Sequence, residues 1–162
     1  MSAKIVTNLN VLEAYLQEAC DMAIDKVAKL VRDKLEEFIL EDFYNTYSPL
    51  FYSRTYAFLK SPKYNVLGNA TAEVFIDTDV MQYLGIAGED VANLASYGFH
   101  GSIEIFREGF YWSDFIKWCN ENVPRLLKIE LKKQGINPLW IWTVTPFFFY
   151  TLKGERNGKY WF

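Results

Sequence analysis

The stretch "NLNVLEAYLQEACDMAIDKVAKLVRDKLEEFILEDFY", Asn8 to Tyr44, largely decides the expected fold. Its apolar residues recur in steps of three and four, the spacing of one face of an amphipathic helix. The opposite face is charged, no Pro or Gly interrupts the pattern, and Asn8 and Asn10 offer capping side chains. We therefore predict one long helix here, with an apolar face of Leu12, Tyr15, Leu16, Ala19, Ala23, Val27, Leu30, Val31, Leu35, Phe38, Ile39 and Phe43.

Such a helix is longer than a small globule can cover, since at 1.5 Å per residue it measures about 50 Å. Part of its apolar face is expected to meet another chain, or another element at its end. The alternative is a bent helix that hides the whole face in one core. The 13 Phe, 11 Tyr and 5 Trp also exceed what a monomeric domain needs, although a thick aromatic core would use them too. The candidate interface residues are Tyr15, Leu30, Phe38, Trp140, Trp142, Phe148 and Trp161.

The next stretch, "YSPLFYSRTYAFLKS" at residues 47–61, mixes rings, hydroxyls, one Pro and one Arg. Pro49 disfavours helical geometry at the residue before it, so the long helix should end near Ser48. Ser48 as cap and Pro49 at the first helical position then indicate a second helix. The guanidinium of Arg54 suits pairing with a carbonyl or carboxylate and stacking on a ring. We expect Arg54 to tie the helix end to a loop.

Short β and helical segments follow. Residues 64–77 are typical of a hairpin with Gly68-Asn69 at its turn. The glycine-rich region 80–109 should hold one short helix closed by Gly98. A second long helix is expected from Ser113, as its cap, to Gln134, with Gly135 as its stop, and Pro124 predicts a kink or a break in it.

The last residues are β-like, with two aromatic strands, Phe147–Leu152 and Tyr160–Phe162, around a turn. The order of elements predicts an α+β fold. In it, a long N-terminal amphipathic helix packs on a small antiparallel sheet, followed by a second helical region and a C-terminal aromatic β-hairpin. We expect one domain over residues 1–136 and a β extension over 137–162 packed on it.

No catalytic or metal-binding pattern is complete in the sequence. His100 is the only histidine, the two cysteines are 99 positions apart, and no phosphate-binding glycine loop occurs. Asp77 and Asp79 follow a strand, where carboxylates are most often solvated turn residues. An enzyme, for instance a small hydrolase, would need them to converge with His100 in one pocket. We expect no catalytic site, no cofactor and no metal.

The net charge of −3 is unevenly distributed. Residues 1–46 carry 5 basic and 9 acidic side chains, whereas residues 110–162 carry 8 basic and 4 acidic ones. The basic residues are dispersed, so specific nucleic-acid binding is not expected. Opposite charge at the two ends instead suits head-to-tail contact between copies. No secretory signal or long apolar segment is visible, so we expect a protein made in the cytoplasm with no membrane partner.

Three motifs resemble a family of small tailed-phage and prophage proteins, the head–tail joining or tail-completion (neck) proteins. The first is a Y-x-P-x-x-Y-x-R-T segment, the second is "YGFHGS" with its His-Gly pair, and the third is the helix "EGFYWSDFIKWCNENV" with "LLKIELKKQGI". The resemblance covers residues 10–136. Its motif residues are Tyr47, Pro49, Tyr52, Arg54, Thr55, His100 and Gly101.

The resemblance implies a non-enzymatic virion protein at the head–tail interface of a tailed phage. Its partners would be further copies of itself in a ring, and portal, connector or tail-tube proteins. The segment Pro138–Phe162 is not part of the family pattern, and "NVPRLL" only faintly echoes a proline-rich stretch of the family. Tail completion, head closure and another neck position therefore stay open. The alternative is a small monomeric binding or regulatory protein encoded by a phage.

Overall fold

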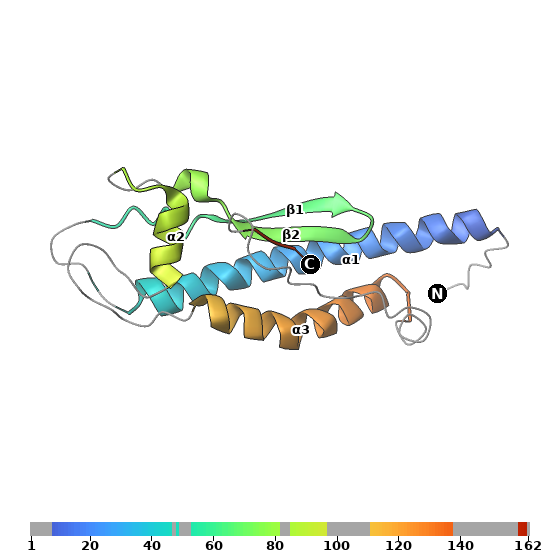
Figure 1. Cartoon of the computed structure of the whole chain (residues 1–162). Helices are drawn as coiled ribbons and strands as arrows, with labels where there is room; N and C mark the ends of the chain where they lie inside the picture. Colours follow the sequence, from blue (N-terminus) through green and yellow to red (C-terminus); the bar gives the residue numbers. More distant parts are fainter. Residues whose placement is uncertain are drawn as a thin grey trace.

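The structure is a computed structural model of the chain, and it describes residues 8–46, 48, 53–81, 85–96, 111–137 and 159–161. Figure 1 shows a long helix, α1 (Leu9–Ile39), with a sheet on one side and a second long helix, α3 (Tyr111–Lys133), on another. A short helix, α2 (Gly88–Ser96), lies near the C-terminal end of α1. The α+β class predicted from the sequence is confirmed.

Helix α1 begins where the sequence predicts. The side chain of Asn8 caps it by accepting a hydrogen bond of 3.0 Å from the backbone N–H of Asn10. The helix continues without a gap into one π-helical turn, η1 (Leu40–Tyr44). Its buried residues start only at Ala19 and run to Ile39. Apolar periodicity thus located the helix correctly, but only part of the apolar face is covered.

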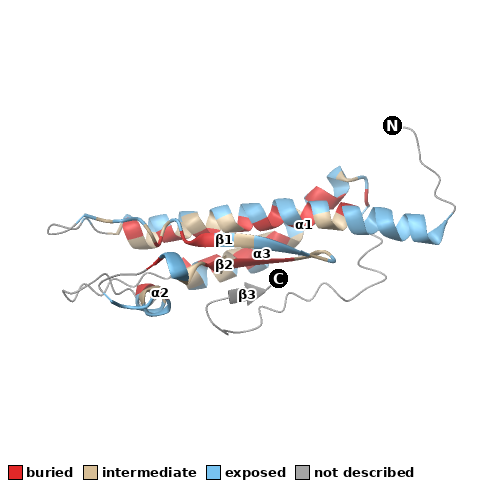
Figure 2. Cartoon of the chain, turned by 90° about the horizontal axis from the view of Figure 1, so that it is seen from above, coloured by how far each residue is buried: buried red, intermediate tan, exposed pale blue. Residues whose placement is uncertain are grey.

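Helix α3 packs antiparallel to α1 (Figure 1). At one end, the rings of Phe38 and Phe115 meet edge to face at 6.3 Å. At the other end, the hydroxyl of Tyr15 donates a hydrogen bond of 2.9 Å to the carbonyl of Gln134. The main core lies between α1, the hairpin and the first half of α3, and Figure 2 shows it as a band of buried residues. A smaller cluster joins the two helices further along: Ala19, Ala23, Leu131 and Ile136.

The C-terminus of α3 is a Schellman motif. Gly135, at φ +82°, donates to the carbonyl of Lys132, and Ile136 donates to that of Leu131. Leu131 and Ile136 are also buried together, which is the apolar contact that accompanies this motif. The predicted stop at Gly135 is therefore confirmed.

Two predictions about α3 need correction. Ser113 is not the cap, because α3 already includes Tyr111, whose side chain is fully buried in the core. Of the two effects predicted at Pro124, a kink or a break, the break is wrong, because the helix is continuous from Tyr111 to Lys133. Proline removes one backbone hydrogen bond. Buried residues on both sides of it, Val123 and Leu131, hold the two halves of α3 against α1.

The sheet has three antiparallel strands in the order β1 (Pro62–Gly68), β2 (Thr71–Ile76), β3 (Lys159–Trp161). The hairpin turn is Asn69-Ala70, one residue later than predicted, with φ of 52° and 54° as in a type I′ turn. The strand predicted at Tyr160–Phe162 is present as β3, and β2 is its partner. The strand predicted at Phe147–Leu152 lies outside the described residues.

The second helix predicted after Ser48 is wrong for the residues that the structure describes. Residues 53–56 have no regular structure, and residues 57–60 form one turn. The backbone of Tyr56 has φ +56°, which interrupts a right-handed helix at that point. The cap-and-proline pattern alone therefore did not predict the backbone of residues 53–60.

The short helix α2 agrees with its prediction, while Gly98 lies outside the described residues. Its first residue, Gly88, is buried against the 3-10 turn η2 (Thr78–Val80). A Cβ atom added at Gly88 would lie 1.8 Å from the carbonyl oxygen of Thr78. Only glycine therefore allows the start of α2 to pack this closely.

Among the described residues, no helix is both long and apolar enough to cross a membrane.

Replacing Gly88 by Ala should force α2 and η2 apart. We expect the free energy of unfolding to fall by about 1–3 kcal/mol, the usual cost of overpacking. Urea denaturation followed by circular dichroism measures this. Leu94→Ala, at an exposed position of the same helix, is the control and should change stability by about 0.5 kcal/mol at most. Equal stability of Gly88→Ala and wild type would mean that this contact does not constrain the fold.

Candidate functional site

The C-terminal end of α1 is held by a group of rings that we name the aromatic joint: Phe43, Tyr44, Tyr56, Phe58 and Tyr111. Tyr44 and Tyr56 stack with ring centroids 4.9 Å apart. Phe58 meets both Phe43, at 5.2 Å, and Tyr111, at 5.4 Å, edge to face. The joint thus connects η1 and the turn at residues 57–60 with the start of α3, which is distant from both in sequence.

Arg54 closes this joint. Its Nη1 atom donates a hydrogen bond to the backbone carbonyl of Tyr44, the last residue of η1. Its guanidinium carbon also lies 5.2 Å from the centroid of the Tyr44 ring. This is the contact between the helix end and a loop that the sequence predicts. Burial raises the pKa of Tyr44, and the charge of Arg54 only partly opposes that effect, so the phenol stays neutral at pH 7.

The other predicted motif residues are less informative. Thr55 accepts a hydrogen bond of 3.3 Å from the backbone N–H of Ala57 and so helps to shape the loop before the turn. Tyr47, Pro49 and Tyr52 lie outside the described residues, as do His100 and Gly101. Their proposed roles therefore stay predictions.

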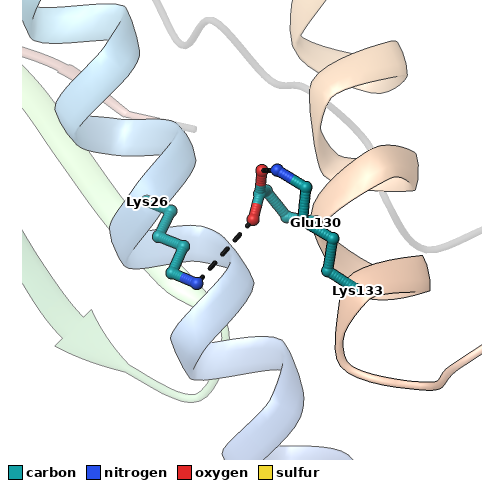
Figure 3. Close-up of polar contacts among 3 residues, drawn as sticks. All are labelled: Lys26, Glu130 and Lys133. Atoms are coloured by element: carbon teal, nitrogen blue, oxygen red, sulfur yellow. Dashed lines mark hydrogen bonds and ion pairs between the residues drawn. The ribbon is translucent and has the colours of Figure 1, made fainter.

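A buried carboxylate connects the two long helices. Glu130 on α3 has a side chain only 8% exposed, and its Oε1 atom accepts a hydrogen bond of 2.6 Å from Nζ of Lys133. Figure 3 shows that Lys26, on α1, points toward the same carboxylate from the other side, at 3.9 Å. Removal of either lysine would leave more of a buried charge uncompensated. Glu130 is thus a packing contact between α1 and α3.

Of the three residues weighed for an enzymatic site, the structure describes only Asp77 and Asp79. Asp77 accepts a hydrogen bond of 3.3 Å from the backbone N–H of Asp79 and thereby caps η2. Asp79 is exposed, and His100 lies outside the described residues. No group of three His, Cys, Asp or Glu side chains among the described residues could hold a metal ion.

The two cysteines are free thiols on the long helices. Burial raises the pKa of Cys119 to about 12, and burial together with the charge of Asp21 raises the pKa of Cys20. Because the thiolate is the reactive form, both thiols are poor nucleophiles at neutral pH.

The candidate interface residues have different environments. Tyr15 and Leu30 are exposed on α1, whereas Phe38 is half-buried against Phe115 and lies under Nζ of Lys34. Trp161 is in β3, and the remaining three, Trp140, Trp142 and Phe148, lie outside the described residues.

Two surfaces were not predicted from the sequence. Val11 was not part of the predicted apolar face, although it lies four residues before Tyr15 and is exposed. The positive charge of the C-terminal third was predicted only as a sum, whereas Arg125, Lys128 and Lys132 share one exposed face of α3. Four-residue and seven-residue spacing along each helix would have identified both groups.

Comparison with known proteins gives one family. A family model described as YomN matches residues 8–133, which run from the cap of α1 to the end of α3. Neither the comparison with curated proteins nor that with solved structures gives a match. The matched region therefore includes both long helices, the hairpin and the aromatic joint.

Replacing Arg54 by Ala should loosen the aromatic joint. The substitution leaves the Tyr44 carbonyl without its charged donor, so we expect a loss of about 1–3 kcal/mol in the free energy of unfolding. Arg54→Lys should recover only part of this loss, because an ammonium group does not reproduce the planar contact with the ring. Urea denaturation of both variants, with the exposed Arg125→Ala as control, measures the effect. Wild-type stability of Arg54→Ala would contradict the assignment.

The thiol of Cys119 should resist modification while the protein is folded. With its pKa raised to about 12, the thiolate fraction stays small up to about pH 9, so reaction with Ellman's reagent should remain slow over that range. A Cys20→Ser variant isolates this thiol. In denaturant its pKa returns toward about 8.5 and the reaction should become fast. Fast reaction of the folded variant at pH 8 would contradict the buried position.

Proposed function

The chain belongs to the YomN family, and on that premise we propose that it is a structural protein of virion assembly in a tailed phage or prophage. The family name is of the Bacillus prophage type and indicates a phage-associated protein. The proposed position is the junction of head and tail, as a neck or tail-completion component. There the chain contacts further copies of itself and portal, connector or tail-tube proteins.

The observation that carries this proposal is the uncovered N-terminal part of α1. Residues 9–18 are all exposed, although they include Leu9, Val11, Leu12, Tyr15 and Leu16. Apolar side chains grouped on a projecting helix favour binding to another protein, since a contiguous exposed apolar surface usually marks an interaction site. A component that joins two large assemblies needs a surface of this kind.

The second support is the resemblance of three motifs to neck proteins, together with the α+β architecture. In this proposal the protein acts by contact alone, without turnover, cofactor or sequence-specific binding of nucleic acid. It is made in the cytoplasm of the bacterial host and ends in the virion. The aromatic joint then has a structural task, which is to fix the C-terminal end of α1 while the opposite end is bound by a partner.

Deletion of the gene from its phage or prophage tests the proposal. After induction, electron microscopy of the lysate should show filled heads and separate tails in place of joined particles. Expression of the wild-type chain in trans should restore infectious particles, and mass spectrometry should detect the chain in purified virions. Gene order offers a quick independent check, because portal, capsid and tail-tube genes should be neighbours.

Two outcomes would contradict the proposal. Normal numbers of infectious particles without the gene would exclude a required role at the head–tail junction. Absence of the chain from purified virions, together with altered phage gene expression in the deletion, would instead support the alternative of a small regulatory protein.

A further inference from the structure

Two rows of apolar residues on α1 extend beyond the core. Residues four apart form an inclined row on a helix surface, and such rows pack into grooves of neighbouring elements. One row runs from Val11 through Tyr15 to Ile39, and the other runs from Leu12 through Leu16 to Ala28. Burial begins only at Ala19 in the first row and at Cys20, half-buried, in the second. The same pattern that builds the core therefore continues uncovered toward the N-terminus.

We name the uncovered part the apolar overhang: Val11, Leu12, Tyr15 and Leu16. Val11 is 54% exposed, and Leu12 and Leu16 are each 39% exposed. Ten residues of helix, 9–18, have no buried member, which corresponds to about 15 Å of helix. The side chain of Tyr15 is 45% exposed, and its hydroxyl contacts the end of α3 through the hydrogen bond to Gln134. Figures 1 and 2 show this end of α1 reaching past the hairpin.

The apolar overhang has an acidic border. Glu13 and Glu18 are exposed and flank it on its two sides at helical spacing. Asp21 and Asp25 follow, and the first basic residue of α1 is Lys26. A partner that covers this end of the helix should therefore combine an apolar contact with positive charge.

The chain itself carries such a surface, which we name the basic face of α3: Arg125, Lys128, Ile129 and Lys132. These positions are spaced at three, four and seven residues, so they share one side of the helix. All four are exposed, and Ile129 is an apolar residue 38% exposed among three cations. The ion pairs of the described residues involve neither these cations nor Glu13 and Glu18. The neighbouring pair Glu130 and Lys133 is already engaged with itself and with Lys26.

Charge decides how two copies can pair. A two-fold contact between two overhangs would place Glu13 and Glu18 of one copy against the same acidic residues of the other. Within one chain, the ion pairs of the described residues do not join Glu13 or Glu18 to the cations of the basic face, so both surfaces keep their charge for another copy. Contact between the overhang of one copy and the basic face of the next avoids repulsion and covers apolar surface on both sides.

We propose that the apolar overhang of α1 in one copy docks on the basic face of α3 in the next copy. This inference rests on the proposed function and specifies the surfaces of its self-contact. The contact is heterologous, so repetition generates a ring where the rotation closes. The patch is small, hence the contact between isolated copies is weak, and it is weakened further by salt.

Charge reversal on each surface provides the test. One variant carries Glu13→Lys and Glu18→Lys, and the other carries Arg125→Glu, Lys128→Glu and Lys132→Glu. Sedimentation velocity across protein concentration and salt measures association. Each variant alone should associate about tenfold more weakly than wild type, since like charges then face each other. An equimolar mixture of the two should recover association, as should a chain that carries all five substitutions.

A second pair of variants tests the apolar part. Leu12→Ser with Leu16→Ser should weaken association about tenfold. Both side chains are exposed in the single chain, so its unfolding free energy should change by about 0.5 kcal/mol or less per site. Leu67→Ser, at an exposed position of β1, is the matched control and should leave association unchanged.

Four results would overturn the inference. The first is a wild-type chain that stays monomeric at about 1 mM in low salt, and the second is unchanged association of the α3 variant. The third is a mixture of the two charge-reversal variants that does not recover association. The fourth is a loss of association in the Leu67→Ser control equal to that in the Leu12→Ser, Leu16→Ser variant. Unchanged association of the α3 variant with loss in the overhang variants would point to a two-fold contact or another occupant of the overhang. The proposed function is judged separately by the deletion phenotype, which does not depend on association of the isolated chain.

Discussion

The packing of apolar rows on α1 is the constraint on which the rest of the structure depends. The hairpin and α3 both pack on this helix. The hairpin covers one side and is held at its tip by the hydrogen bond of 2.7 Å from the Ala70 N–H to the Asp21 carboxylate. Helix α3 covers another side and is held at its ends by Phe115 and by the Tyr15 hydroxyl. Because α1 is longer than both partners, some of its apolar face remains uncovered.

The elements with strong local patterns could be predicted from the sequence. Apolar residues in steps of three and four predict α1, and Gly135 predicts the end of α3. The β-branched and aromatic residues of Thr71–Ile76 predict the second strand of the hairpin. The predictions that failed concern features that tertiary contacts determine. Pro124 weakens a helix locally, but burial of residues on both sides of it keeps α3 continuous.

The candidate site was predictable to a similar degree. The residue type of Arg54 indicated a carbonyl contact, but its acceptor, Tyr44, could be identified only once the loop was in place. The stacking of Tyr44 on Tyr56 depends on a positive φ at Tyr56, which no simple sequence rule predicts for tyrosine. Net charge by segment indicated two faces of opposite sign, and helix geometry was needed to assign them to residues.

The apolar residues spaced four apart on α1 would thus serve two purposes. Those in the C-terminal two-thirds of the helix build the core, and those in the N-terminal third would bind a partner chain. Hydrogen exchange measured by mass spectrometry at low and high protein concentration tests this division most directly. We predict that the amides of residues 9–18 and 125–132 gain protection together on assembly, while those of the hairpin do not change. No added protection of residues 9–18 in the assembled state would contradict the account.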